Sequence, residues 1–427
     1  MPGWFRAALL AFAMATAVGG CAGKRAGGVA ACKGRSLDEL FPPTEWKHIE
    51  FDDHDVGNLS DVKFLLGLPR RYGYFELTAP ECQCRAAAAS TEGNSLAAER
   101  RSIEAKEKHH GLSESERLKI RILRASELEA RNKSAGLALE VYYHLAEALA
   151  NHDVVDASIN ETELALGKVD RMRRQGLEFP FDDGEITRQR LELVQKRVAL
   201  ELQTNQLNIQ LVRLLGLPAT DPSLRFWPTT DWKVVVEPID MATAVAVGLA
   251  TRPEIRLLES LPPDLNKKTV SVVKVLLAGG SGGLLGSDVK ASSLISIFGI
   301  REMLSKACDN KKELPVRQRQ LAEYTEQRRQ EVTSEVQLAV LTIETRLCEI
   351  AVVKKTSQAW EYRNDQLKKL QRIEKATFAD LWGAKLKQLQ AESDEIGRVV
   401  AWKIALAKLK EAQGKLIEEC SGTCFPR

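Results

Sequence analysis

The sequence predicts a mainly α-helical protein, built from two long antiparallel helical hairpins of the coiled-coil or α-barrel type, with at most a small β portion. Three observations support this fold class. Apolar residues recur with helical spacing through residues 137–217 and 314–417, one short link divides each stretch, and shifting the numbering by 198 aligns the two stretches. Charged residues form 28% of the chain and aromatic residues 6%, which suits long helices with solvated faces better than a compact enzyme core.

Residues 1–20 have the layout of a secretory signal peptide. Arg6 precedes an apolar run over residues 7–18, which is shorter than the ~20 residues of a membrane-spanning helix. The run ends in Val18-Gly19-Gly20-Cys21, which resembles a bacterial lipobox, so Cys21 is the predicted lipidation site. An ordinary signal peptide followed by a coincidental Cys is the alternative.

Residues 21–36 are rich in Gly, Ala and basic residues without an apolar period, and we interpret them as a lipidated flexible tether. Ala22 follows the lipobox Cys, and by resemblance to enteric bacteria the lack of Asp there favours the outer membrane. Residues 37–84 are interpreted as an irregular packed segment. The first helical repeat would then occupy residues 85–250, with a polar, helix-favouring composition up to about residue 135.

The second half of the first stretch carries two apolar seams. Leucines recur with heptad spacing at 193, 200, 207 and 214, and a second series contains Leu191, Val198 and Val212. At ~100° per residue these series lie on nearly opposite sides of a helix. A two-stranded coiled coil needs one seam, so two seams predict a helix with a partner on each side, as in a wall of helices. A central helix in a globular bundle is the alternative.

Turn residues mark both links. Gly176 and Pro180 interrupt the first stretch, and Asp182 or Asp183 can cap the helix that follows. The second repeat, residues 251–427, contains a predicted helix over 314–373, a link over 374–377 and a helix over 379–417. So short a link requires antiparallel helices.

The shift by 198 also superposes the two links. It aligns Leu149 with Leu347, Asp182 with Asp380, Leu191 with Leu389, and Gly216 with Gly414. Heptad sequences align easily by chance, so the coincident links and the terminal Gly pair carry the argument for a duplication.

Three local motifs then resemble the outer-membrane efflux protein family, the TolC-like channel proteins. They are Asn205-Gln206-Leu207-Asn208-Ile209 running into Leu214-Leu215-Gly216-Leu217-Pro218, the segment Arg252-Pro253-Glu254, and Phe378-Ala379-Asp380-Leu381. The segment Ser293-Leu294-Ile295-Ser296-Ile297-Phe298 is also similar to the strand that enters the family's last long helix. The resemblance covers residues 135–420.

The resemblance implies a homotrimeric tube that conducts substrates passively and works with a periplasmic adaptor and an inner-membrane pump. It implies an outer-membrane location with most of the chain in the periplasm. The links would form the inner tip of the tube, so Asp182, Asp183, Glu374 and Asp380 are candidate tip or gate residues, each repeated around the trimer.

The sequence departs from the family where strands of a β-barrel are expected. Residues 85–135 show no alternation of apolar and polar residues, and only residues 270–298 contain candidates, at Val270–Leu277 and Ser292–Phe298. The barrel would therefore be reduced. A periplasmic coiled-coil scaffold lipoprotein without a pore is the alternative function, and continuous helix through 85–135 would favour it.

No catalytic or metal motif stands out. The formal net charge is +3, which indicates no nucleic-acid partner, and the phosphate-loop, hydrolase-elbow and zinc-protease motifs are missing. His109-His110 is interpreted as solvated surface. Disulfides are permitted in an oxidising envelope among Cys82, Cys84, Cys420 and Cys424, whereas Cys308 and Cys348 are expected to be buried or half-buried. We therefore predict no enzyme, no cofactor and no metal.

Overall fold

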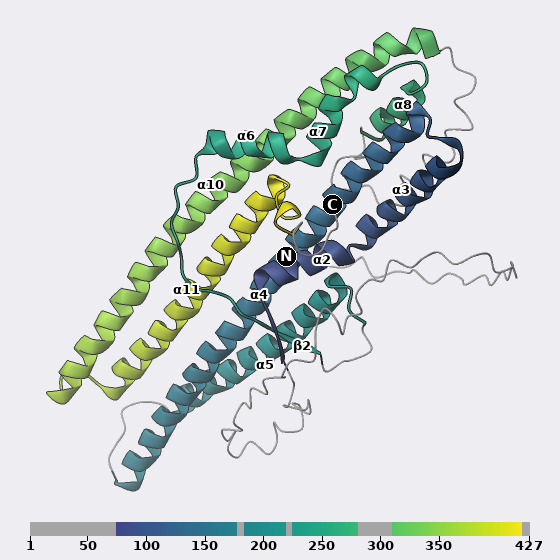
Figure 1. The fold of residues 1–427 in the computed structure, drawn as a ribbon. Coiled ribbons are helices and arrows are strands. Elements are labelled where there is room, and N and C mark those ends of the chain that lie inside the picture. The colour runs from purple at the N-terminus through teal and green to yellow at the C-terminus, as the bar shows by residue number, and fades with distance from the viewer. Residues whose placement is uncertain (1–73, 177–182, 219–223, 281–309, 421–427) are drawn as a thin grey trace, which may run out of the picture. The chain divides into compact units, whose positions relative to one another are not determined.

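The computed structural model describes residues 74–176, 183–218, 224–280 and 310–420. The first repeat contains β1 (Tyr74–Leu77), α2 (Ala79–Ala89), α3 (Thr91–His110), α4 (Glu114–Arg174), α5 (Asp183–Leu214) and β2 (Arg225–Pro228). The second contains α6 (Met241–Thr251), α7 (Pro253–Ser260), the 3-10 turn η1 (Pro262–Asp264), α8 (Val270–Gly280), α10 (Asn310–Arg372), α11 (Phe378–Ala412) and η3 (Glu418–Cys420). The mainly α-helical fold with two long hairpins is confirmed (Figure 1).

Four long helices form the framework. Helix α4 packs against α5 and against α11, and α11 packs against α10. The first predicted seam of α5 is the one that contacts α4, because Leu193 and Leu200 pack on Val155 and Ile159. In the second hairpin, Val332, Val336, Val340 and Ile343 of α10 pack on Val399, Trp402 and Leu409 of α11. Helices α4 and α11 are thus the inner pair, and α5 and α10 are the outer pair.

The structure reproduces the sequence repeat at four landmarks. Helices α4 and α10 end at Arg174 and Arg372, and α5 and α11 end at Leu214 and Ala412. Shortly beyond each helix end the backbone turns left-handed. The φ angles are 73° at Gly176 and 60° at Glu374, and 66° at Gly216 and 72° at Gly414. A left-handed residue after a helix terminates it by redirecting its last carbonyls, and Gly does so without steric cost.

Each repeat begins its helical part with two consecutive helices, α2 and α3 in the first repeat and α6 and α7 in the second. Helices α2 and α6 both have 11 residues, and a single residue, Ser90 or Arg252, separates each from the next helix. The left-handed Gly that ends each hairpin lies against this junction: a Cβ on Gly216 would meet Ala89, and one on Gly414 would meet Arg252. The following helices differ, since α3 has 20 residues and α7 has 8 residues.

The strand predicted at Val270–Leu277 is wrong, because this segment forms α8. Val270, Val273 and Leu276 are buried in a cluster with Leu118 of α4 and Leu321 of α10. Contacts around a short apolar run decide its conformation, since Val favours strands only where the surroundings suit a sheet. The Ser292–Phe298 candidate lies outside the described residues.

Residues 85–135 are helical, as their composition predicts. Helices α3 and α4 are joined by a turn at 111–113, in which Gly111 has φ 68° and Ser113 forms a capping box with Glu116. No helix in the described ranges is long and apolar enough to cross a membrane.

The irregular segment predicted over 37–84 needs a correction at its end, which holds β1 and the start of α2. Strand β1 pairs in parallel with β2, from Tyr74 opposite Arg225 to Leu77 opposite Pro228. Buried Leu77 and Phe226 join the cluster formed by α2, α4 and α5. This pairing could not be predicted from the sequence, because both strands are very short and the whole first hairpin lies between them in the chain.

A disulfide joins the beginning of the first repeat to the end of the second. Cys84 of α2 bonds to Cys420 of η3, with a Cα–Cα distance of 5.3 Å. Beside it, Gln83 Nε2 donates to the Leu416 carbonyl at 2.7 Å, and Leu416 is fully buried. The prediction for Cys348 is wrong, since this residue is exposed on α10; Cys308 lies outside the described residues.

Candidate functional site

The helix ends that adjoin the two links lie together in the structure. Trp382 and Phe378, at the start of α11, pack on Ala165 and Val169 near the end of α4 and on Ile186 near the start of α5. The ammonium group of Lys168 lies 4.8 Å from the centre of the Phe378 ring. The ends of both hairpins that carry the links, here called the tip, therefore form one contiguous region.

The structure places the predicted acidic residues unequally. Asp380 is exposed and is the third residue of α11, where its carboxylate accepts from Thr377 N at 3.0 Å while Asp380 N donates to Thr377 Oγ1 at 3.1 Å. The hydroxyl of Thr377 is the main cause that lowers the pKa of Asp380. Glu374 is exposed in the link. Asp183 begins α5, and Asp182 and Cys21 lie outside the described residues.

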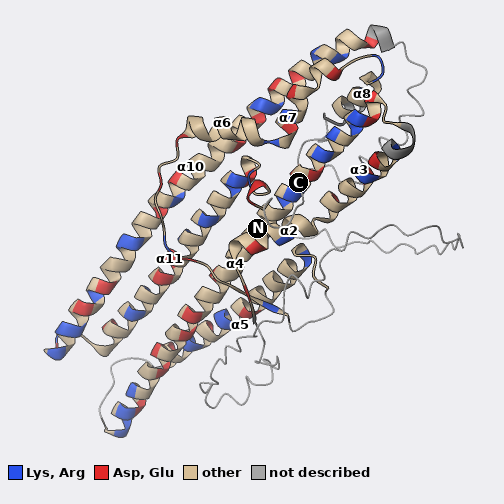
Figure 2. Ribbon diagram, viewed as in Figure 1, with Lys and Arg blue, Asp and Glu red and all other residues tan. Residues whose placement is uncertain are grey.

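Basic residues share the tip with these carboxylates. The last turn of α4 holds Arg171, Arg173 and Arg174, and that of α10 holds Lys369 and Arg372. They are visible as the blue ends of both hairpins in Figure 2. Cations at helix C-termini stabilise the partial negative charge of the last carbonyls. The tip is thus not uniformly acidic: these basic residues adjoin the links in the sequence but were not among the predicted tip residues.

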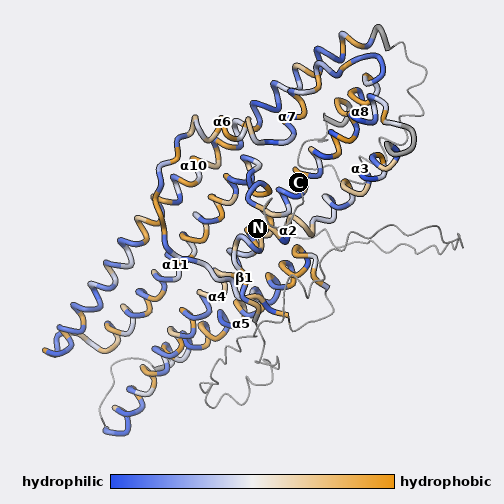
Figure 3. Tube along the Cα trace, in the orientation of Figure 1, coloured by the Kyte–Doolittle hydropathy of each residue, from blue (hydrophilic) through white to orange (hydrophobic). Residues whose placement is uncertain are grey.

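The outer helices expose apolar residues at heptad spacing. On α5 the stripe runs through Leu191, Val198, Leu202 and Ile209, whose exposed fractions lie between 41% and 66%. On α10 it contains Leu338, Leu341, Cys348, Val352 and Tyr362, all exposed. The orange turns among blue ones along both helices show this mixture (Figure 3). Of the second seam predicted for α5, Leu191 and Val198 lack cover within the described part of the chain, while Val212 is buried.

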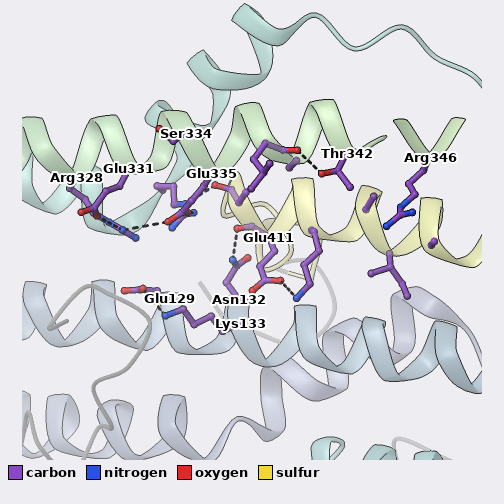
Figure 4. A pocket seen from close by; sticks show the side chains of 18 of the residues that line it. Glu129, Asn132, Lys133, Arg328, Glu331, Ser334, Glu335, Thr342, Arg346 and Glu411 are labelled. Carbon is purple, nitrogen blue, oxygen red and sulfur yellow. Dashed lines mark hydrogen bonds and ion pairs between the residues drawn. The ribbon is translucent and has the colours of Figure 1, made fainter. Parts of the chain in front are cut away.

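A groove of about 1520 Å³ lies between α4 on one side and α10 and α11 on the other. Its lining includes Ala339, Val400 and Ile404, and one end holds the side chains of Glu129, Lys133, Arg328, Glu331 and Glu335 (Figure 4). At that end, Arg252 and Glu254 of the segment Arg252-Pro253-Glu254 belong to a buried network of ion pairs. Arg252 Nη1 donates to Glu254 Oε1 at 2.7 Å and Arg252 Nε donates to the Ala412 carbonyl at 2.6 Å.

The network extends onto α10. Arg328 donates to Glu254 Oε1 at 3.2 Å and to Glu331 at 2.8 Å, and Arg252 also pairs with Glu335. Glu254 is fully buried, and Arg252 and Arg328 are buried to more than nine-tenths. Removing one member of such a network leaves an uncompensated buried charge, which costs several kcal/mol. Arg252 therefore joins the α6–α7 junction, α10 and the end of α11.

Across the groove from this network lies Glu129 of α4. It is 9% exposed, and Lys133 Nζ lies 3.2 Å from its Oε1. Burial and the neighbouring Glu254 raise the pKa of Glu129 to about 7, against the pull of Lys133 and Arg328. Glu129 and Arg328 do not stand out in the sequence, because nothing in a helical, charge-rich sequence distinguishes a buried charged side chain from a solvated one.

No protein-family profile and no curated protein matches the chain. Solved structures do. The outer-membrane channel OprN is similar with 16% identity and a TM-score of 0.50, over 71% of this chain and 70% of that chain. The Campylobacter jejuni CmeC outer membrane channel is similar with 12% identity and a TM-score of 0.51, over 71% of this chain and 67% of that chain. The Neisseria gonorrhoeae MtrE outer membrane channel in its open state is similar with 12% identity and a TM-score of 0.54, over 79% of this chain and 89% of that chain.

These likenesses are too distant in sequence to carry a function, but they agree in fold over most of both chains. The chain has the fold of the outer-membrane efflux channels, the TolC-like proteins, as the family resemblance predicted.

Proposed function

We propose that this chain is one subunit of a homotrimeric outer-membrane conduit for efflux or export. The observation that carries the proposal is the pair of exposed apolar stripes on α5 and α10, the two outer helices of the framework. An apolar stripe on each edge suits a head-to-tail contact in which α5 of one copy packs on α10 of the next. Such contacts close into a ring, and a ring of long helices is a tube.

The positions of the two stripes along the helices support this contact. Rotation about an axis along the tube keeps each residue at its distance from the tip. Ile209 follows the start of α5 by nearly the same stretch of helix as Cys348 precedes the end of α10. At ~1.5 Å of rise per residue, the two positions differ by only ~3 Å along the axis. Leu202 and Val352 correspond in the same way.

In this proposal the protein is a passive conduit without chemistry of its own. Lipid on Cys21 would hold it to the outer membrane while the helices lie in the periplasm. A periplasmic adaptor and an inner-membrane pump would supply the substrate and the energy. The acidic residues Asp182, Asp183, Glu374 and Asp380 would sit at the periplasmic mouth, where the basic ends of α4 and α10 offset part of their charge.

A specific observation favours the alternative, a periplasmic coiled-coil scaffold lipoprotein without a pore. Helices α3 and α4 connect through a short turn at 111–113, where the family resemblance led us to expect strands. A scaffold would use the same outer stripes to bind partner helices. The two functions differ in conductance and need not differ in oligomeric state.

Cysteine crosslinking tests the ring. The exposed thiol of Cys348 should form a disulfide with Ile209→Cys of the neighbouring copy under mild oxidation, giving dimers and trimers on a non-reducing gel. Leu200→Cys is the matched control, since this position faces α4 inside the subunit and should give no intersubunit product. Purely monomeric Ile209→Cys protein in detergent would contradict the proposal.

Conductance in planar bilayers then separates the two functions. A crosslinked trimer that conducts ions supports the conduit, whereas a trimer that gives no conductance supports the scaffold. For the anchor, Cys21→Ser should release the mature chain from the membrane fraction. Continued sedimentation with membranes and unchanged processing would exclude lipid as the anchor.

A further inference from the structure

The end of the groove near Glu129 is where a carboxyl group of the first repeat faces the ion network of the second. Glu129 and Lys133 lie on α4, whereas Arg328, Glu331 and Glu335 line the opposite side from α10 (Figure 4). We call this set, together with Arg252 and Glu254, the repeat junction. Glu129, Arg252, Glu254 and Arg328 are buried, so water screens the interactions among these four charges only weakly, whereas Lys133, Glu331 and Glu335 are partly exposed.

The two arginines of the repeat junction already form ion pairs with carboxylates other than Glu129. Arg252 binds Glu254 and Glu335, and Arg328 binds Glu254 and Glu331. The cation that forms an ion pair with Glu129 is Lys133, which belongs to the same helix and is about one-third exposed. Solvent therefore weakens the ion pair between Glu129 and Lys133, although the carboxyl group of Glu129 is itself buried.

Ionisation of Glu129 would place a second carboxylate charge in the buried part of the junction, beside Glu254. Both buried arginines already bind Glu254, and each also binds a more exposed carboxylate, Glu335 or Glu331. A buried carboxylate whose own ion-pair partner is partly exposed is costly to ionise, so the closed arrangement favours the neutral acid.

We propose that Glu129 is a proton-binding group that couples the packing of the two repeats to pH: the neutral carboxyl group allows α4 to pack closely against α7, beside the buried arginine of α10, and its ionisation weakens the contact between α4 and α7. The groups that face Glu129 are Lys133 on α4, Glu254 on α7, and Tyr324 and Arg328 on α10. The repulsion comes from Glu254, which is fully buried and cannot move into solvent without breaking its bonds to both arginines.

The direction of the pH effect follows from the carboxyl group itself. Its pKa in the folded chain is about 7, above the ordinary value of 4.5, so the folded state binds the proton more tightly than the unfolded state does. The contribution of Glu129 to stability is therefore fully present below about pH 4.5. It decreases as pH rises through about 7, and it is lost in alkaline solution.

Thermal unfolding of the full chain between pH 5 and pH 8.5 tests the proposal. Wild type should lose about 3–5 °C more over this range than Glu129→Gln, whose amide cannot ionise. Glu331→Gln is the matched control from the same junction. Its carboxylate is partly exposed and hydrogen-bonded to Arg328, and its pKa is lowered, so this variant should keep the pH slope of the wild type.

Hydrogen exchange locates the effect. After correction for intrinsic rates, backbone amides of residues 124–136 and 324–336 should exchange faster at pH 8.5 than at pH 5.5 in wild type and in Glu331→Gln. In Glu129→Gln this difference should disappear. Equal pH slopes in wild type and Glu129→Gln, or faster exchange confined to the tip, would overturn the proposal.

Discussion

The two repeats agree in their hairpins and differ in how those hairpins are held. Helix ends and left-handed residues coincide when one repeat is aligned on the other. The junction before the first hairpin is Ser90, whose hydroxyl accepts from Gly93 N and from Ser134. The corresponding residue in the second repeat is Arg252, the centre of a buried ion network. A duplicated framework thus tolerates very different chemistry where it joins the rest of the chain.

The difference shows what constrains each part. The two hairpins must have similar lengths, because α4 packs against both α5 and α11 and the ends of these three helices meet at the tip. The junctions have only to fill the space beside a left-handed Gly. In the first repeat the Ala89 side chain does so, and in the second the backbone of Arg252 and the ring of Pro253 do so, while the Arg252 guanidinium donates to the nearby Ala412 carbonyl.

The largest expected effect separates the two junctions. Arg252→Met removes the bonds to Glu254, Glu335 and the Ala412 carbonyl, and should lower the free energy of unfolding by about 3–5 kcal/mol. Ser90→Ala, at the matching position, loses only hydroxyl hydrogen bonds and should cost about 1 kcal/mol. Urea unfolding followed by circular dichroism measures both. Similar losses would show that the junctions are energetically equivalent despite their chemistry.

Removing the disulfide between the two repeats should have the next largest effect on stability. Cys84→Ser should cost about 2–5 kcal/mol, since the bond joins residues separated by 336 positions and restricts the unfolded chain. Treating wild-type protein with dithiothreitol should lower its unfolding midpoint to that of the variant. Cys348→Ser removes an exposed thiol and is the control that should unfold as wild type does.

Replacing Gly216 or Gly414, the left-handed glycines that end the two hairpins, should lower the free energy of unfolding by a smaller amount. Both have positive φ, so Ala costs about 1–2 kcal/mol at either position through backbone strain. A Cβ on Gly216 would also approach Ala89 Cβ to 2.7 Å, whereas on Gly414 the nearest atom would lie at 3.4 Å. Gly216→Ala should therefore be the more destabilising change in thermal unfolding. The reverse order would mean that the first junction yields more easily than the second.

The smallest effect concerns Asp380 at the tip. Asp380→Ala removes one half of the Thr377 capping box and should cost about 1 kcal/mol. Asp380→Asn keeps an acceptor oxygen and should cost less. Because the pKa of Asp380 is lowered, its contribution should be lost as pH falls through that pKa. Thermal unfolding of both variants across the acidic range measures this loss.

The same two variants test a role for the charge of Asp380 in conduction. If that charge contributes to the mouth of the conduit, Asp380→Asn should alter cation block in bilayers while its unfolding midpoint stays near that of wild type. An effect seen only with Asp380→Ala, together with lower stability, would leave Asp380 as a cap alone.

The sequence by itself determined the hairpins, because long helices carry their signals locally. Heptad spacing defines the buried face, Gly176, Gly216 and Gly414 end helices through their own backbone freedom, and a repeat doubles each signal. Tertiary structure decided the features that depend on distant partners. Val270–Leu277 is helical because α4 and α10 bury it, and β1 finds β2 across the whole first hairpin. Cys84 pairs with Cys420, rather than with a nearer Cys, because α2 and η3 meet. Whether a carboxylate such as Glu129 is solvated or buried is likewise settled by the opposite repeat, since burial is a property of the surroundings and not of the residue.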